Sequence, residues 1–103
     1  MKNSIRKDWK LIESLIQEKS KVLDIGCGEG ELIKQLNKNI NADTRGIEID
    51  PELARKAIGA GLNVVQGNAE DGLNQYSNQS FDYVILSQTL QAMNRPKDVL
   101  IDL

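Results

Sequence analysis

The residues best suited to chemistry lie between Val22 and Gly30, where a short apolar run is followed by regularly spaced glycines. Asp24, Gly26, Gly28 and Gly30 stand at every second position. Glycines in a turn allow positive φ angles and let a ligand approach the backbone where a Cβ atom would block it. The apolar run predicts a buried parallel strand, and the residues after the turn predict a helix. A strand, a glycine turn and a helix N-terminus together form a ligand-binding cradle.

Charge around the turn indicates the kind of ligand. Asp24, Glu29 and Glu31 place three acids near the turn, where a pyrophosphate would meet like-charge repulsion. The dinucleotide fingerprint also needs a glycine where this chain has Glu31. A nicotinamide-dependent oxidoreductase fragment is therefore the less favoured alternative. S-adenosylmethionine carries a sulfonium and an ammonium against one carboxylate, so its net positive charge suits an acidic turn.

A further acid, Glu48, lies 22 residues beyond Gly26 at the end of a predicted strand over 44–49. Ligands of open α/β sheets bind at the carboxyl ends of the strands, where an acid can accept hydrogen bonds from a ribose diol. Asp50 and Pro51 then provide an N-cap and a first helical residue for a helix over 51–60. Alternating strands and helices predict a doubly wound, mostly parallel α/β sheet.

The remaining predicted elements belong to the same domain. An amphipathic helix over 4–19 is predicted to pack an apolar stripe on the sheet, formed by Ile5, Trp9, Ile12, Leu15 and Ile16. The other predicted elements are a third strand over 63–66, a helical turn over 71–73, a fourth strand over 81–86 and a helix over 97–103 that follows Pro96.

Composition excludes several classes of function. The chain has 103 residues and a net charge of -2, so no basic surface indicates nucleic acid. No stretch approaches the roughly 20 apolar residues of a membrane span, and a cytoplasmic location is expected. Histidine is absent and Cys27 is the only cysteine. These counts argue against Cys-His and Ser-His-Asp catalysis and His-dependent metal sites. Without a histidine to activate it, Cys27 is expected to be a small side chain tolerated beside the ligand rather than a nucleophile.

Two sets of residues carry a resemblance to known proteins. The run V-L-D-I-G-C-G-E-G from Val22 resembles the first motif of class I S-adenosylmethionine-dependent methyltransferases, which have a Rossmann-like sheet. The runs R-K-D-W-K-L-I, G-I-E-I-D-P, V-V-Q-G-N and F-D-Y-V-I-L-S-Q-T-L-Q-A resemble the methionine biosynthesis protein MetW family over essentially the whole chain.

The resemblance implies a bacterial, cytoplasmic protein that binds S-adenosylmethionine and works alongside a homoserine O-acyltransferase. By position, Asp24, Gly26, Cys27 and Gly28 would contact the methionyl part, Glu48 the ribose, Asn68 and Ala69 the adenine, and Leu86 and Ser87 the pocket floor, with Ile49 in the same cofactor-binding set. S-adenosylhomocysteine would be the product of methyl transfer. No catalytic residue is identified.

The resemblance also implies that residues 1–103 are the amino-terminal portion of a single methyltransferase-like domain. Relatives have seven strands in the order 3-2-1-4-5-7-6, whereas this sequence predicts only the first four. The fourth strand would then be an exposed apolar edge, open to a partner or to a second copy. Two functions stay open: a small-molecule methyltransferase, and a non-catalytic module that senses S-adenosylmethionine.

Overall fold

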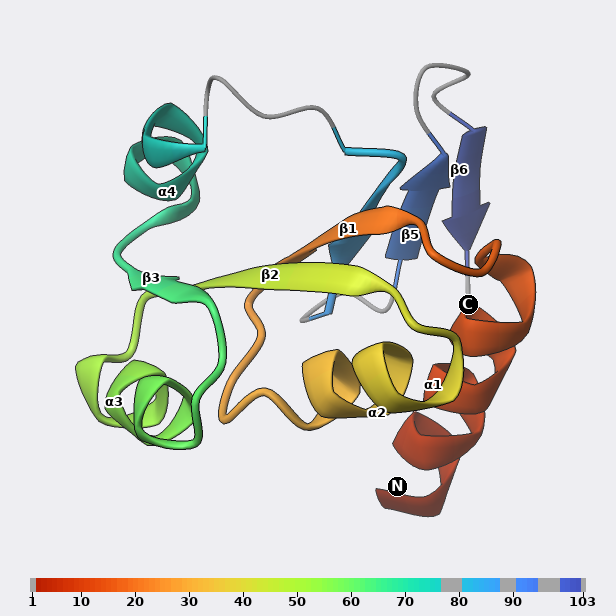
Figure 1. The fold of residues 1–103 in the computed structure, drawn as a ribbon, viewed down its shortest axis with the longest axis horizontal. Coiled ribbons are helices and arrows are strands. Elements are labelled where there is room, and N and C mark those ends of the chain that lie inside the picture. Colours follow the sequence, from red (N-terminus) through yellow and green to blue (C-terminus); the bar gives the residue numbers. More distant parts are fainter. Residues whose placement is uncertain (1, 77–80, 88–90, 95–98, 103) are drawn as a thin grey trace.

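The computed structural model describes residues 2–76, 81–87, 91–94 and 99–102, and the side chains of residues 9–70, 72–76 and 81–87. Its strands form one sheet in the order β3-β2-β1-β4-β5-β6 (Figure 1). The elements are α1 (Lys2–Leu15), β1 (Lys21–Ile25), α2 (Glu31–Asn39), β2 (Asp43–Glu48), α3 (Pro51–Gly59), β3 (Val64–Gln66), α4 (Ala69–Gln75), β4 (Tyr83–Leu86), β5 (Gln91–Asn94) and β6 (Val99–Asp102).

Four parallel strands form the part of the sheet that the sequence predicts. β1 pairs in parallel with β2 and with β4, and β2 pairs in parallel with β3. α1, α2 and α3 lie on one face of this sheet, and α4 lies on the other (Figure 1). The predicted doubly wound arrangement is confirmed, because successive strands are joined through helices that cover both faces.

Alternation along the strands divides the core between the two faces. On the α1 and α2 face, the buried cluster contains Ile12, Ile16, Val22, Leu32, Leu36, Ala42, Tyr83 and Ile85. A second buried cluster, towards α3, contains Cys27, Ile33, Ala54, Ala57 and Val64. A third buried cluster, on the α4 face of the sheet, contains Leu23, Ile47, Tyr76 and Val84.

α1 departs from its predicted length and stripe. The helix ends at Leu15 rather than Lys19, and Lys19 has a φ of 63°, which is incompatible with a continuing helix. Ile12 and Ile16 are buried as predicted, but Leu15 is 42% exposed. Leu15 lies three positions after Ile12 and is therefore rotated to the border of the apolar face. The prediction that Leu15 belongs to the buried stripe is wrong. The side chain of Ile5 lies outside the described residues.

The carboxyl-terminal prediction is also wrong. Residues 99–102 form β6 instead of a helix, and β5 pairs antiparallel with both β4 and β6. β5 supplies backbone partners to β4, so the sheet has six strands and β4 is no longer an edge. A second copy therefore cannot pair with β4 as expected, because both sides of β4 are already paired within the chain. Pro96 and Lys97 lie outside the described residues.

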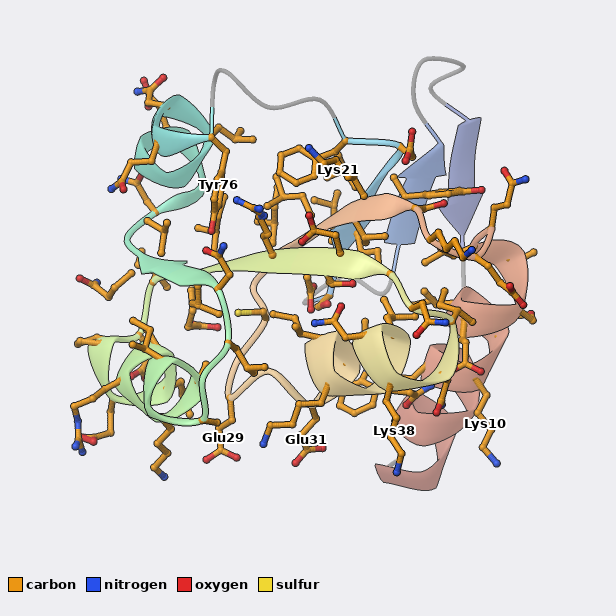
Figure 2. The ribbon with its side chains drawn as sticks, in the orientation of Figure 1. Lys10, Lys21, Glu29, Glu31, Lys38 and Tyr76 are labelled. Atoms are coloured by element: carbon orange, nitrogen blue, oxygen red, sulfur yellow. The ribbon has the colours of Figure 1, made fainter. Side chains whose placement is uncertain are left out.

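The helix after β3 is longer than the predicted single turn, because α4 covers Ala69–Gln75. Gly72 in this helix lies close against Ile47, where a Cβ atom would come within 2.6 Å of the isoleucine side chain. The Tyr76 hydroxyl lies 3.3 Å from the Gly46 carbonyl oxygen, to which it donates a hydrogen bond. Tyr76 thus extends from the end of α4 to β2 (Figure 2).

Replacing Gly46 by alanine should destabilise the fold. A Cβ atom on Gly46 would lie 2.6 Å from the Cys27 sulfur and 2.8 Å from Ile33 Cδ1. Overpacking of this kind costs about 1–3 kcal/mol, which urea unfolding would measure. Gly59→Ala is the matched control, because nothing lies within 4 Å of its added Cβ. Equal stability of Gly46→Ala and the wild type would contradict this packing.

Candidate functional site

The three glycines of the turn have different roles. Gly26, Gly28 and Gly30 have φ angles of 80°, 60° and 90°, all in the region that favours glycine. A Cβ atom on Gly30 would collide with Leu62 Cδ1, so Gly30 allows α2 to pack closely against the Leu62 side chain. A Cβ atom on Gly28 would meet nothing within 4 Å. Gly28 therefore leaves open space beside the backbone, as a ligand cradle requires.

Backbone hydrogen bonds hold the turn against the end of β2. The Gly26 and Cys27 amides both donate to the Ile47 carbonyl, at N···O distances of 2.8 and 3.2 Å. The Gly30 amide donates to the Cys27 carbonyl at 3.0 Å and closes the turn. The conformation of the turn thus depends on β2 as well as on its own glycines.

Glu48 joins the turn to the start of α3. Its side chain is buried, with one oxygen accepting from the Gly28 amide at 2.6 Å and the other from the Asp50 amide at 2.9 Å. Asp50 is the predicted N-cap of α3 and accepts from the Glu52 and Leu53 amides. A carboxylate has about four acceptor positions. Glu48 therefore retains acceptor capacity for a ligand.

Asp24 lies on β1 and is completely buried. One of its carboxylate oxygens accepts a hydrogen bond from the Ser87 hydroxyl, and Oδ2 has no hydrogen-bond partner among the described residues. Burial raises the pKa of Asp24 to about 7; the Ser87 hydrogen bond lowers it and the nearby Glu48 charge raises it further. Burial and the neighbouring acid thus both favour the neutral form of Asp24.

The other predicted cofactor-binding residues follow the ends of neighbouring strands. Ile49, directly after β2, is 59% exposed. Asn68 and Ala69 follow β3, where the Gly67 amide donates to the Glu48 carbonyl at 2.9 Å. Leu86 ends β4, and the Ser87 amide donates to the Ile25 carbonyl at 3.0 Å. Parallel pairing therefore places all ten predicted residues along one edge of the sheet.

Two of the acids that suggested a cationic ligand lie on the outside. Glu29 and Glu31 are exposed and point away from the sheet (Figure 2). Glu29 also forms an ion pair with Lys56, with Nζ 3.2 Å from Oε1. The acids that lie in the cradle are instead Asp24 and Glu48. The sequence argument counted Glu29 and Glu31 toward the charge of the cradle, and their exposed positions show that this part was wrong.

Cys27 lies in a buried, mostly apolar environment. Its side chain is buried against Gly46 and Ile33. Burial raises the pKa of its thiol to about 12, and the charges of Asp24 and Glu48 contribute to the rise. A thiol with so high a pKa is a poor nucleophile at neutral pH. This environment agrees with the expectation that Cys27 is not a nucleophile, and it adds a packing role that the sequence did not indicate.

Sequence reasoning missed the hydrogen bond between Ser87 and Asp24, which joins residues 63 positions apart. It placed both residues in the site, but only the pairing of β1 with β4 shows that they meet. The described residues contain no group of three His, Cys, Asp or Glu side chains that could hold a metal ion. None of the described helices is long and apolar enough to cross a membrane.

Comparison with known sequences assigns the family. The profile of the family described as methionine biosynthesis protein MetW matches residues 6–103. The chain belongs to this family. The bifunctional methionine biosynthesis protein MetXA/MetW of Rhodopirellula baltica is 32% identical over 101 residues, which cover 90% of this chain and 16% of that protein.

Solved structures agree on the fold. A TehB-like S-adenosylmethionine-dependent methyltransferase from Corynebacterium glutamicum is 28% identical with a TM-score of 0.64, and the match covers 77% of this chain and 42% of that one. The plantazolicin methyltransferase BamL, solved with S-adenosylhomocysteine, is also 28% identical with a TM-score of 0.61, over 80% and 33% of the two chains. The chain thus has a Rossmann-like methyltransferase fold and spans less than half the length of these structures.

The buried Asp24 should make stability depend on pH. Its folded pKa of about 7 exceeds the ordinary value of 3.8, so between about pH 4 and 7 the folded state holds a proton that the unfolded state has lost. Stability contributed by this group therefore falls as the pH rises through that window, by at most about 1.4 kcal/mol per pH unit. Asp24→Asn should remove this fall in urea unfolding.

The exposed Asp43→Asn is the control for this measurement and should keep the wild-type pH dependence. If Asp24→Asn and the wild type lost stability in parallel from pH 4 to 7, the raised pKa of Asp24 would be wrong.

Proposed function

We propose that this chain binds S-adenosylmethionine at the carboxyl ends of β1 to β4, as part of a methyltransferase-like domain acting in methionine biosynthesis. The observation that carries the proposal is the pair of buried acids, Asp24 and Glu48, beside an open glycine turn. Family membership and methyltransferase-like fold support the same conclusion.

The residues present fit the methionyl part of this cofactor. Asp24 has a buried carboxylate oxygen without a hydrogen-bond partner, and a cationic group would satisfy it. Gly28 leaves room for the approach of a ligand to the backbone. S-adenosylmethionine would supply a methyl group on a positively charged sulfur, and Gly26 and Cys27 would line the same turn.

We assign the contacts to the ribose and adenine of the cofactor to residues at the carboxyl ends of β2, β3 and β4. The free acceptor capacity of Glu48 suits the two ribose hydroxyls. Ile49 presents an exposed apolar side chain next to Glu48, where it could cover one face of the adenine. Asn68 follows β3 and Ala69 begins α4, and we assign the adenine contacts to these two residues by resemblance. Leu86 and Ser87 would complete the floor.

Whether methyl transfer follows from binding is a separate part of the proposal. Transfer to an acceptor that is already nucleophilic needs mainly positioning, and we assign no catalytic acid or base. The second candidate function is a regulatory module that binds the cofactor and acts on a homoserine O-acyltransferase. Support for such a partner comes from the Rhodopirellula relative, which bears the MetXA and MetW names in one chain.

Calorimetric titration with S-adenosylmethionine tests the binding site. We expect the wild-type chain to bind this ligand and not NAD. Glu48→Ala should weaken binding at least about tenfold, since hydrogen bonds to a charged group contribute roughly 1.5–3 kcal/mol. Glu52→Ala is a matched control because Glu52 is exposed in the first turn of α3.

Circular dichroism would verify that each of these variants is folded. Binding of NAD alone, or unchanged affinity in a folded Glu48→Ala variant, would contradict the proposed site.

The partner proposal predicts an effect on acyl transfer. Adding this chain to a homoserine O-acyltransferase from the same source should raise the rate of acyl transfer or give a complex in size-exclusion chromatography. Methyl transfer to candidate acceptors would be assayed in parallel. Acyltransferase activation without methyl transfer would favour the regulatory module, and neither complex nor activation would contradict the partner.

A further inference from the structure

Asp24 is a buried acid with one oxygen that lacks a hydrogen-bond partner among the described residues, and the neighbouring charge that acts on it is that of another acid, Glu48. We propose that Asp24 carries a proton in the ligand-free site and releases it to solvent when a cationic ligand binds. The identity of that ligand, S-adenosylmethionine, rests on the proposed function. The protonation of Asp24 in the free protein does not.

The groups around Asp24 come from three neighbouring segments. Glu48 acts on it from β2, and the Cys27 thiol lies in the turn that follows β1. Ser87, directly after β4, donates its hydroxyl hydrogen to Asp24. Among these described neighbours there is no cation, and the Lys56 ammonium is paired with the exposed Glu29. A charged Asp24 would therefore lie next to Glu48 without a compensating positive charge.

The hydrogen bonds decide which acid takes the proton. Glu48 accepts two backbone N–H groups, one on each oxygen, and these donors suit a negative carboxylate. Asp24 accepts one hydroxyl and has no donor for its other oxygen. Two buried carboxylates in one site disfavour double ionisation. The proton consequently resides on Asp24, and the pKa of about 7 at this residue agrees.

Ligand binding would exchange one positive charge for another. The Asp24 O–H bond breaks and its proton passes to the buffer, while the positive group of the ligand becomes the partner of the carboxylate. No electrons are transferred. Below pH 7 each bound ligand should release most of one proton, so affinity should rise with pH by at most tenfold per unit.

Calorimetry at pH 6 in two buffers of different ionisation enthalpy measures the released proton. S-adenosylmethionine is the probe, and its amino group remains protonated at this pH because α-amino groups titrate near 7.7–8.0. We expect the wild type to release more than half a proton per ligand bound. Asp24→Asn should release none, and its affinity should not change between pH 5.5 and 6.5. Asp43→Asn should behave as the wild type.

A carbon-13 NMR titration of the Asp24 carboxyl group in the ligand-free chain completes the test. Titration near pH 7 supports the inference, and titration below pH 5 overturns it whether or not a ligand binds. Binding without proton release would overturn the inference and leave the proposed function intact. Absence of binding by a folded chain in which Asp24 titrates near pH 7 would overturn the proposed ligand but support the protonated acid.

Discussion

Two carboxylates buried at one edge of the sheet constrain the whole site. Asp24 and Glu48 lie at the ends of adjacent parallel strands, where burial alone would make two negative charges costly. The fold resolves this by giving Glu48 two backbone N–H donors, one from the glycine turn and one from the start of α3. Those bonds also position the turn and the helix. Asp24 has no hydrogen-bond donor for one of its oxygens, so a cationic ligand would stabilise its charged form.

The sequence predicted the part of the structure whose signals are local. Glycine spacing located the turn, Asp50 and Pro51 located the start of α3, and apolar runs located the parallel strands. The shared location of the proposed site residues was predictable because parallel strands end on the same side of the sheet. What could not be predicted was the long-range contact between Ser87 and Asp24. A chain position indicates which edge a residue occupies, but not which side chain it meets.

The wrong predictions have separate physical causes. Residues 97–103 contain an apolar pattern compatible with a helix, but residues 99–102 pair in the sheet beside β5. The partner strand is near in the sequence, since Asn94 pairs with Val99. A short apolar run is compatible with either a helix or a strand, so its pattern alone does not decide between them. Leu15 was wrongly predicted to be buried because it lies next to the buried Ile16 in the sequence, and one position along a helix is enough to turn a side chain from the buried face to its border. Glu29 and Glu31 were assigned to the cradle because the sequence does not show which side of a turn points outward.

The central claim is that the edge formed by the ends of β1 to β4 is a cofactor site. Amide chemical-shift mapping by nitrogen-15 NMR, with S-adenosylmethionine added stepwise to the chain, tests the location directly. We expect the largest shifts at the amides of Gly26, Gly28 and Ile49, with the α1 amides unchanged. Shifts concentrated on α1 or on the outer face of α3, with the glycine turn unaffected, would contradict the account.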